Sequence, residues 1–377
     1  MSATGTVSAD VEKLRQNLRD RIAAHKAPFH VIDVPLAQAA IDQLQGSEPE
    51  HWAAVWSAPG AAFAEKAKAL ETAGDTDGAR ENYLLAYGFY HVARFPSPIH
   101  PAKDAAYRKS IEMFRAAGRY FSPPLEVIEV PFTGRHEGEG QTVTFYVRRK
   151  PSTAKQPVLI RCGGVDTWKE ERNDYNDLCI AAGFAQINID APGVGEAPLP
   201  GSIDGERMYL PMLDWIRTQP DLDADRVLFV GMSYGGYWST KIAHCYHDRF
   251  AGVVNWGGGV DKFFSRDWSL SSLSASSYLM DLGPARARTV GKKTYDEYIT
   301  EVEGFSLLKQ GILDGPHAPM LVLNGRHDEQ VPFDDMVLLL EHGAPKAARF
   351  FPGGHMGYGP NTFPTVLAWL KRQAGIA

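Results

Sequence analysis

The segment Gly-Met-Ser-Tyr-Gly-Gly places a glycine two residues before and two residues after Ser233, at the point where an apolar run, residues 226–230, comes to an end. The run before it is typical of a strand, and the residues after it have helical character. A serine hydroxyl is a poor nucleophile unless a base takes its proton, and it must project clear of the backbone. A sharp turn from strand to helix achieves this projection, and the positive end of the helix favours developing negative charge. The segment therefore predicts a nucleophilic serine, and the alternative is a glycine-rich turn with a capping serine.

An acid and a base follow in the order that such a serine requires. Asp328 comes soon after the apolar run 319–324, and His355 comes soon after the run 348–351. Because the carboxyl ends of parallel strands meet at one edge of a sheet, we expect both side chains beside Ser233. Other residues compete for the two roles: Glu329, Asp334 and Asp335 for the acid, and His327 for the base.

Acyl chemistry at a serine also needs N–H donors for the oxyanion that forms during the reaction. We expect the first donor to be the backbone N–H of Tyr234, the residue after the serine. The second is expected from the loop after the third strand, where Gly163 and Gly164 permit an unusual backbone path. Val165 or Asp166 then supplies the N–H, and the alternative is that the two glycines form an ordinary turn.

The pattern of the chain changes about a third of the way along. Helical patterns dominate the first part, near residues 9–25, 50–73, 78–94 and 102–119, with breaks at Pro59, Gly74 and 95–101. From Pro123, short β-rich runs alternate with segments of helix length, which predicts an α/β class with a mainly parallel sheet flanked by helices. We expect a helical domain over 1–122 and a catalytic domain over 123–377, with an insertion around 259–318 at the carboxyl edge of the sheet.

The composition argues against several kinds of partner. Lys and Arg number 39 against 45 Asp and Glu, and no basic tract is present, so we expect no nucleic-acid partner. The first residues are charged and no stretch reaches the ~18 apolar residues of a membrane span, which predicts no membrane association and a cytoplasmic location. Three scattered cysteines, Cys162, Cys179 and Cys245, do not make a disulfide framework and favour thiols in the core.

Two local patterns hint at ligands, but neither is complete. His244, Cys245 and His247 lack a second pair of residues that would complete a metal site. The segment 190–198 contains Gly-x-Gly without the rest of a dinucleotide-binding pattern. We therefore expect no metal and no cofactor.

The segments around Ser233, Asp328 and His355, together with the loop after the third strand, resemble the α/β-hydrolase superfamily over residues 123–377. The helical N-terminal region and the segments GGVDTWKEE and DAPGVGEAP are similar to a narrower group. This group comprises the 2,6-dihydroxypseudooxynicotine hydrolase type, fungal polyketide-shortening hydrolases and some bacterial esterases. The resemblance implies an eight-stranded sheet, a helical cap that helps to shape the pocket, and a triad of nucleophile, acid and base at these three residues.

The resemblance also implies the reaction, which is hydrolysis of an ester or of a carbon–carbon bond next to a ketone. Members that cleave carbon–carbon bonds use an extra acidic residue near the substrate. The candidates by location are Asp166, Glu196, Asp261 and Asp267. For Asp166 the alternative is a structural ion pair with Lys169.

Aromatic residues in loops at the predicted active edge favour a small apolar or aromatic substrate. They are Trp168, Trp256, Phe263, Phe264 and Trp268, and packing in the core is the alternative for each. The expected reaction starts with attack of Ser233 on a carbonyl and proceeds through an acyl-enzyme. The competing hypotheses are a carboxylesterase or acyltransferase without carbon–carbon activity, and a non-catalytic binding protein on the same scaffold. The helical domain, with its aromatic faces, also suggests a homodimer.

Overall fold

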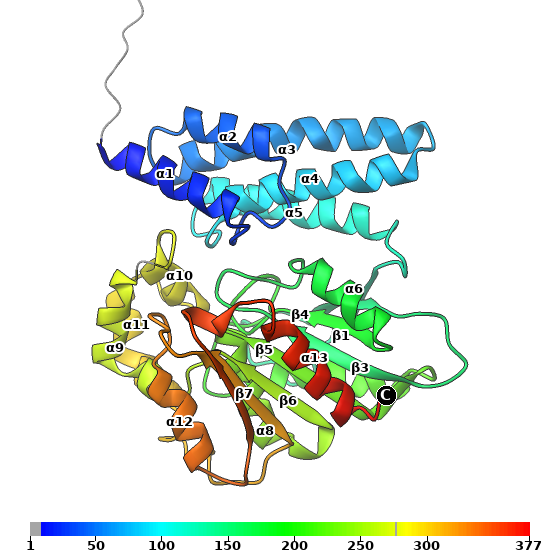
Figure 1. The fold of residues 1–377 in the computed structure, drawn as a ribbon, viewed down its shortest axis with the longest axis vertical. Helices are drawn as coiled ribbons and strands as arrows, with labels where there is room; N and C mark the ends of the chain where they lie inside the picture. Colours follow the sequence, from blue (N-terminus) through cyan, green and yellow to red (C-terminus); the bar gives the residue numbers. More distant parts are fainter. Residues whose placement is uncertain (1–8, 276) are drawn as a thin grey trace, which may run out of the picture. The chain divides into compact units, whose positions relative to one another are not determined.

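The computed structural model describes residues 9–275 and 277–377, and the chain divides into two compact units, Met1–Leu125 and Glu126–Ala377 (Figure 1). The first unit is helical and the second is built on a sheet. The helices of the first unit are α1 (Ala9–Ala23), α2 (Val34–Gln43), α3 (Pro49–Thr72), α4 (Thr76–Arg94) and α5 (Pro101–Gly118). Four of them lie where the sequence predicted helices.

Helix α2 was not predicted from the sequence, and α3 differs from the prediction at Pro59. The ten residues of α2 are few for a periodic pattern, and its start is fixed locally because Asp33 accepts a hydrogen bond from the N–H of Leu36 at 2.9 Å. Helix α3 continues through Pro59 although an interior proline typically costs ~3 kcal/mol. The buried Trp56, which lies one turn before Pro59, packs against Phe89 of α4, and this burial offsets the cost.

The aromatic face of α4 is buried within the chain. Tyr87 packs against Phe114 of α5 with ring centroids 5.2 Å apart, and Tyr83 donates a hydrogen bond to Glu71 of α3 at 2.8 Å. These contacts assign Tyr83 and Tyr87 to packing within the helical unit. They also remove this face as a reason to expect a homodimer, which stays a prediction.

The second unit contains an eight-stranded sheet in the order β1-β2-β4-β3-β5-β6-β7-β8 among the described residues. The strands are β1 (Glu126–Pro131), β2 (Thr142–Arg148), β3 (Gln156–Cys162), β4 (Ala185–Ile189), β5 (Leu222–Met232), β6 (Gly252–Trp256), β7 (Met320–Gly325) and β8 (Ala347–Phe351). Strand β2 pairs antiparallel with β1 and β4, and the other neighbours are parallel. Strands β3, β4, β6 and β7 are buried along their whole length, as expected of central parallel strands that are covered on both faces.

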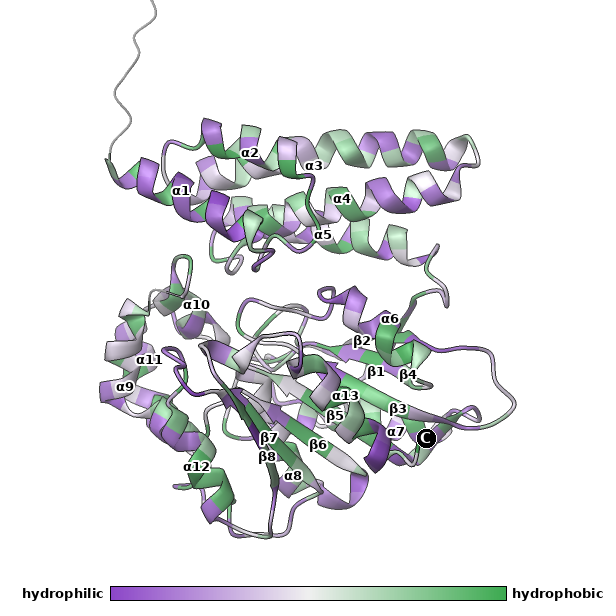
Figure 2. Ribbon diagram, in the orientation of Figure 1, coloured by the Kyte–Doolittle hydropathy of each residue, from purple (hydrophilic) through white to green (hydrophobic). Residues whose placement is uncertain are grey.

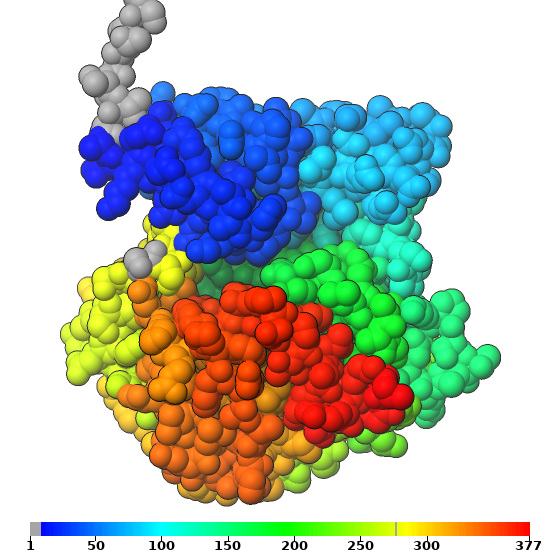
Figure 3. Space-filling view, viewed as in Figure 1, coloured from blue at the N-terminus to red at the C-terminus, as the bar shows by residue number. Residues whose placement is uncertain are grey.

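Helices cover both faces of this sheet. On one face, α6 (Asn173–Ala181) and α13 (Thr362–Gln373) close a core that includes Val230, Val254 and Leu323 (Figures 1 and 2). On the other face, α7 (Leu210–Thr218) and α8 (Tyr234–Cys245) pack against β5. Part of the surface of this unit is formed by the C-terminal residues, which are drawn in red in the space-filling view (Figure 3).

The connection from β6 to β7 contains short helices. They are η3 (Lys262–Phe264), α9 (Arg266–Ser271), η4 (Ser272–Ser274), α10 (Leu282–Thr289), α11 (Tyr295–Glu301) and η5 (Val302–Phe305). Helix α12 (Phe333–Glu341) anchors the start of this connection, because the Asp335 carboxylate accepts the N–H groups of residues 260–263 at 2.7–3.2 Å. Burial raises the pKa of Asp335 above its ordinary value even though these N–H groups oppose the change.

The three cysteines are free thiols, and Cys245 differs from the prediction. Cys162 and Cys179 are buried, whereas Cys245 is exposed at the last position of α8. No helix in the described part of the chain is both long enough and apolar enough to cross a membrane. Within that same part, no group of three or more His, Cys, Asp or Glu side chains is arranged to hold a metal ion.

Candidate active site

Ser233 occupies a sharp turn between β5 and α8. Its backbone has φ 54° and ψ −120°, a strained conformation for a residue with a side chain. The turn is held because the N–H of Ser233 donates to the Trp256 carbonyl at 2.8 Å and the N–H of Gly236 donates to the Ser233 carbonyl at 2.7 Å. A Cβ at Gly235 would lie 2.4 Å from the Gly163 carbonyl oxygen, so the turn needs glycine there.

Ser233, His355 and Asp328 form a continuous chain of hydrogen bonds. Nε2 of His355 lies 2.8 Å from Oγ of Ser233, and Nδ1 of His355 lies 2.7 Å from Oδ2 of Asp328. A carboxylate only accepts hydrogen bonds, so Nδ1 carries the proton and Nε2 accepts from the serine hydroxyl. The structure thus brings the three predicted residues together in the arrangement that activates a serine.

The Asp328 carboxylate has donors on both oxygens. Oδ2 accepts from His355 and from Nδ2 of Asn324 at 2.8 Å, and Oδ1 accepts from the N–H groups of Gln330 at 2.8 Å and Val331 at 3.1 Å. Burial by itself raises the pKa of Asp328, but the attraction of His355 and these hydrogen bonds lower it below its ordinary value. Asp328 is therefore ionised near neutral pH and available to stabilise a charged imidazole.

The predicted rivals of Asp328 and His355 lie in other environments. Asp335 holds the backbone after β6, and Asp334 pairs with Lys262 on the surface at 2.6 Å. Glu329 and His327 are exposed. The carboxylate that contacts His355 is that of Asp328.

Asn324, at the end of β7, was not identified from the sequence. Its Nδ2 donates to Asp328, and its Oδ1 accepts from the N–H groups of Gly325 and Met356, each at 2.8 Å. One amide thus ties the acid to the loop that carries His355. The signal in the sequence was a polar residue at the end of an apolar strand, because a buried polar side chain needs partners.

The loop after β3 lies against the serine. A Cβ at Gly164 would lie 3.1 Å from the Ser233 Cβ and 3.4 Å from its Oγ. Tyr234 is the first residue of α8, and the first N–H groups of a helix have no acceptor within the helix. Val165 and Tyr234 line one small cavity, in which Phe263 and Phe264 also lie. The predicted oxyanion donors therefore belong to segments that meet at Ser233, and the choice between Val165 and Asp166 stays a prediction.

A buried ionic cluster holds the loop after β3. Nζ of Lys169, which is fully buried, lies 3.0 Å from Glu170, 2.7 Å from Asp190 and 2.7 Å from Glu196. The cluster joins the loop after β3 to the loop after β4. Burial raises the pKa of Glu170 more than the nearby Lys169 lowers it.

The four candidates for an extra acid have different surroundings. Glu196 is held by Lys169, and Asp261 accepts a hydrogen bond from Ser306 at 2.5 Å. Asp267 is exposed in the first turn of α9, and Asp166 accepts from the Thr167 hydroxyl at 3.4 Å. These contacts do not select one of them as a proton donor to substrate.

The predicted aromatic residues divide into two groups. Trp256 belongs to the core cluster and donates to the Met356 carbonyl at 2.7 Å, and Trp168 is buried with its indole donating to the Val165 carbonyl at 3.0 Å. Their positions favour packing, which corrects the prediction that they bind substrate. Phe263 and Phe264 line the cavity beside Val165 and Tyr234, and their binding role stays a prediction.

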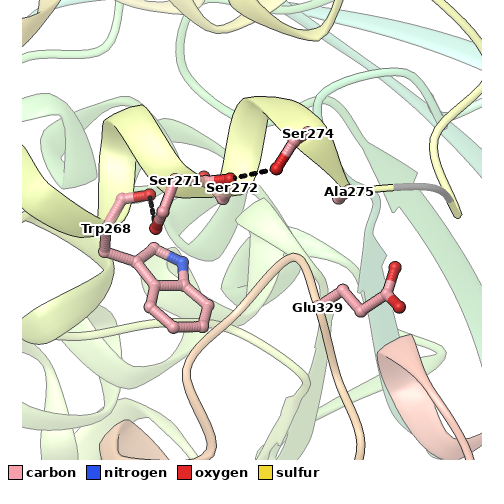
Figure 4. Close-up of a pocket in the computed structure, with 6 residues that line it drawn as sticks. All are labelled: Trp268, Ser271, Ser272, Ser274, Ala275 and Glu329. Carbon is pink, nitrogen blue, oxygen red and sulfur yellow. Dashed lines mark hydrogen bonds between the residues drawn. The ribbon is translucent and has the colours of Figure 1, made fainter.

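Trp268 lines a second pocket of about 320 Å³ in the connection from β6 to β7 (Figure 4). Its other lining residues are Ser271, Ser272, Ser274, Ala275 and Glu329. The hydroxyls of Ser271 and Ser274 donate to backbone carbonyls one turn earlier, at 3.2 and 2.8 Å. These two hydroxyls are therefore already used within the helix.

The sheet order, with a serine at the turn after β5, an aspartate after β7 and a histidine after β8, defines an α/β-hydrolase fold. Solved structures agree. A crystal structure of 2,6-dihydroxy-pseudo-oxynicotine hydrolase matches with a TM-score of 0.74 and 21% identity, and the match covers 95% of this chain and 94% of that one. This likeness confirms the predicted fold.

The chain belongs to the FrsA-like esterase family, whose model, described as "Esterase FrsA-like", matches residues 16–349. Esterase FrsA of Photobacterium profundum is 24% identical over 341 residues, which are 88% of this chain and 78% of that protein. The 2,6-dihydropseudooxynicotine hydrolase of Paenarthrobacter nicotinovorans is 28% identical over 239 residues, which are 62% of this chain and 59% of that protein. The resemblance inferred from the motifs is thereby confirmed.

Proposed function

We propose that the protein is a serine hydrolase that cleaves a bond next to a carbonyl group in a small apolar or aromatic substrate. The bond is that of a carboxylic ester or a carbon–carbon bond beside a ketone. The observation that carries this proposal is the hydrogen-bonded chain from Ser233 through His355 to Asp328. The family description as esterases supports the ester, and the named relative that hydrolyses 2,6-dihydropseudooxynicotine supports a substrate with an aromatic ring.

In the proposed reaction, Nε2 of His355 takes the proton of Ser233 as Oγ attacks the substrate carbonyl. The carbonyl oxygen becomes an oxyanion that accepts hydrogen bonds from the N–H of Tyr234 and from the loop that contains Val165. Asp328 holds the imidazole in place and stabilises its charge. Collapse of the intermediate breaks the bond to the leaving group and leaves an acyl-enzyme, which water then hydrolyses with His355 again as the base.

The leaving group distinguishes the two reactions. An ester releases an alkoxide or phenoxide, whereas a 1,3-diketone releases an enolate that takes a proton at carbon. His355 carries the proton removed from Ser233 and is able to return it in either case. The apolar side chains of Phe263 and Phe264 beside Tyr234 suit a small apolar or aromatic group.

Product analysis by mass spectrometry on a panel of aryl esters and aryl 1,3-diketones tests the proposal. Wild type and Ser233→Ala are compared in parallel, and labelling with a fluorophosphonate reports the reactive serine. We expect labelling and cleavage in wild type, and loss of both in Ser233→Ala. Equal products from the two proteins, or labelling that persists without Ser233, would contradict the proposal. Transfer of the acyl group to added alcohols in preference to water would indicate an acyltransferase.

A further inference from the structure

Arg286, in α10, is a buried cation that the proposed mechanism does not use. Its exposed fraction is 4%. Its guanidinium donates to the Ser272 hydroxyl at 2.7 Å and, over longer distances, to the Tyr295 hydroxyl at 3.5 Å and the Gln330 carbonyl at 3.4 Å. All three acceptors are neutral. Within the described residues, the ion pairs include no carboxylate partner for Arg286.

A buried guanidinium without a carboxylate is unusual, because arginine stays charged and the loss of hydration is costly. Hydrogen bonds to two neutral hydroxyls and one carbonyl compensate only part of the hydration free energy that the guanidinium loses on burial. The ring of Phe263, 5.0 Å from the guanidinium carbon, adds a cation–π contact. The arrangement has hydrogen-bonding capacity to spare, since arginine has five N–H donors in a fixed fork.

Arg286 lies near the residues that are proposed to bind the oxyanion. Arg286 lines the same small cavity as Val165 and Tyr234, which belong to the two segments proposed to bind the oxyanion. The remaining lining is largely apolar and includes Phe263, Phe264, Thr289, Val290, Tyr298, Val302 and Phe305. A substrate group that enters this cavity meets one cation among apolar side chains.

We propose that Arg286 binds a second, negatively charged oxygen, carried by a carboxylate of the substrate or by the enolate that forms when a 1,3-dicarbonyl is cleaved. This inference rests on the proposed function, because it needs the first carbonyl at Ser233. A guanidinium and a delocalised oxyanion form short, charge-assisted hydrogen bonds. The substrate then supplies the negative charge that pairs with Arg286, and Arg286 favours substrates that carry such a charge.

For a 1,3-diketone the same contact assists cleavage. Ser233 Oγ forms a bond to one carbonyl carbon and passes its proton to His355. When the carbon–carbon bond breaks, its electron pair moves into the leaving group, which departs as an enolate. The enolate oxygen accepts hydrogen bonds from Arg286, and the proton on Nε2 of His355 moves to the enolate carbon. The products are the acyl-enzyme and a neutral ketone, so atoms and charges balance.

Two esters of the same shape test this inference. The 4-nitrophenyl monoester of succinic acid carries a terminal carboxylate, and 4-nitrophenyl 4-methylpentanoate carries an uncharged group of similar size in its place. We expect wild type to prefer the charged ester in kcat/KM. In Arg286→Met, kcat/KM for the charged ester should fall roughly 10- to 100-fold, as for the loss of a hydrogen bond to a charged group. The uncharged ester should change by less than about 3-fold, within the effect of a lost cation–π contact.

Two further variants separate binding from structure. Arg286→Lys keeps the charge but loses the fork, so it should recover part of the preference, and it serves as the test protein if Arg286→Met does not fold. Lys293→Met removes an exposed positive charge shortly after α10 and should leave both esters unchanged. Cleavage of 1-phenylbutane-1,3-dione is the second arm. A selective loss there in Arg286→Met identifies the enolate, and a selective loss on the succinate ester identifies the carboxylate.

Three results would overturn the inference. The first is an equal loss of activity on the charged and the uncharged ester, which would indicate a purely structural role. The second is the absence of any preference in wild type together with unaffected diketone cleavage in Arg286→Met. The third is equal selectivity in wild type, Arg286→Met and Arg286→Lys. Cleavage that persists in Ser233→Ala would instead refute the proposed function. The two failures are therefore distinguishable in one set of measurements.

Discussion

Both oxygens of Asp328 are fully engaged as acceptors, and this determines what an amide would do there. Oδ2 faces His355 and Asn324, and Oδ1 faces the N–H groups of Gln330 and Val331. An asparagine has one oxygen and one NH2 group, so its NH2 group must face N–H groups that are themselves donors. The imidazole then loses the acceptor that fixes its tautomer.

We therefore predict that Asp328→Asn lowers kcat on aryl esters by about 10⁴-fold, as such a replacement does in a Ser-His-Asp triad. Steady-state kinetics on the best ester of the panel would measure this, with a thermal melt to verify folding. Asp334→Asn is the matched control, because it changes an exposed aspartate six positions further along that pairs only with Lys262 among the described residues. Retention of more than a tenth of the activity in Asp328→Asn would assign the acid elsewhere.

The sequence predicted which side chains lie together where each follows a strand in a fixed order, and it did not predict contacts that packing alone decides. Ser233, Asp328 and His355 follow three strands whose ends meet. Asn324 was missed because nothing in the local pattern says that its amide reaches the histidine loop. Trp256 was misassigned because a tryptophan at the end of a strand points into the core or into a site with the same local sequence.

At the scale of elements, the ionic cluster around Lys169 controls how the loop after β3 is held. The lysine is enclosed by carboxylates from its own loop and from the loop after β4. Without the cation, like charges would face one another inside the protein. Removal of one partner of a buried ionic network is strongly destabilising for this reason.

We predict that Lys169→Met lowers the free energy of unfolding by about 3–5 kcal/mol, the range for a buried charge left without its partner. Urea unfolding followed by circular dichroism would measure the change. Lys262→Met is the control, since Lys262 is half-exposed and its pair with Asp334 lies on the surface, and it should have a much smaller effect. Equal unfolding midpoints for the two variants would show that the cluster does not hold the fold.

The elements themselves were largely predictable. Each of the eight strands overlaps one of the short β-rich runs of the sequence. Strands β3, β4, β6 and β7 are the clearest cases, because a strand covered on both faces must be apolar along its length. The short helix α2 and the passage of α3 through Pro59 were not, because local propensity does not report tertiary packing. The small helices between β6 and β7 were not predicted individually, although Thr294 and Glu297 form a capping box at the start of α11, which is a signal readable in the sequence.

At the scale of the whole molecule, the family match spans residues of both units, from 16 to 349. The helical unit is therefore part of what defines the family. All three residues of the proposed triad and their hydrogen-bond partners lie within Glu126–Ala377. The proposed chemistry therefore uses residues of the second unit.

The stability of the whole molecule should depend on pH through paired carboxylates. Arg207 binds Glu139 at 2.5 Å and Asp204 at 3.0 Å, and it links the segment between β1 and β2 to the segment before α7. Burial raises the pKa of both carboxyl groups, but the hydrogen bonds, from Arg207 to both groups and from His136 to Asp204, lower each below its ordinary value overall. A carboxyl whose pKa is lowered by folding stabilises the protein above its unfolded pKa, and this contribution is lost as the pH falls through the folded value.

We accordingly predict that Arg207→Met has a lower Tm than wild type at pH 7. The loss should correspond to about 1 kcal/mol in the free energy of unfolding, because the charges around Arg207 are partly exposed. The difference should shrink as the pH falls below about 4, where the unfolded carboxyl groups take up protons. Thermal melts from pH 3 to 7 would measure it, with Arg217→Met, an exposed arginine at the end of α7, as the control. A gap between Arg207→Met and wild type that stays constant down to pH 3 would mean that Arg207 acts through packing and not through these two charges.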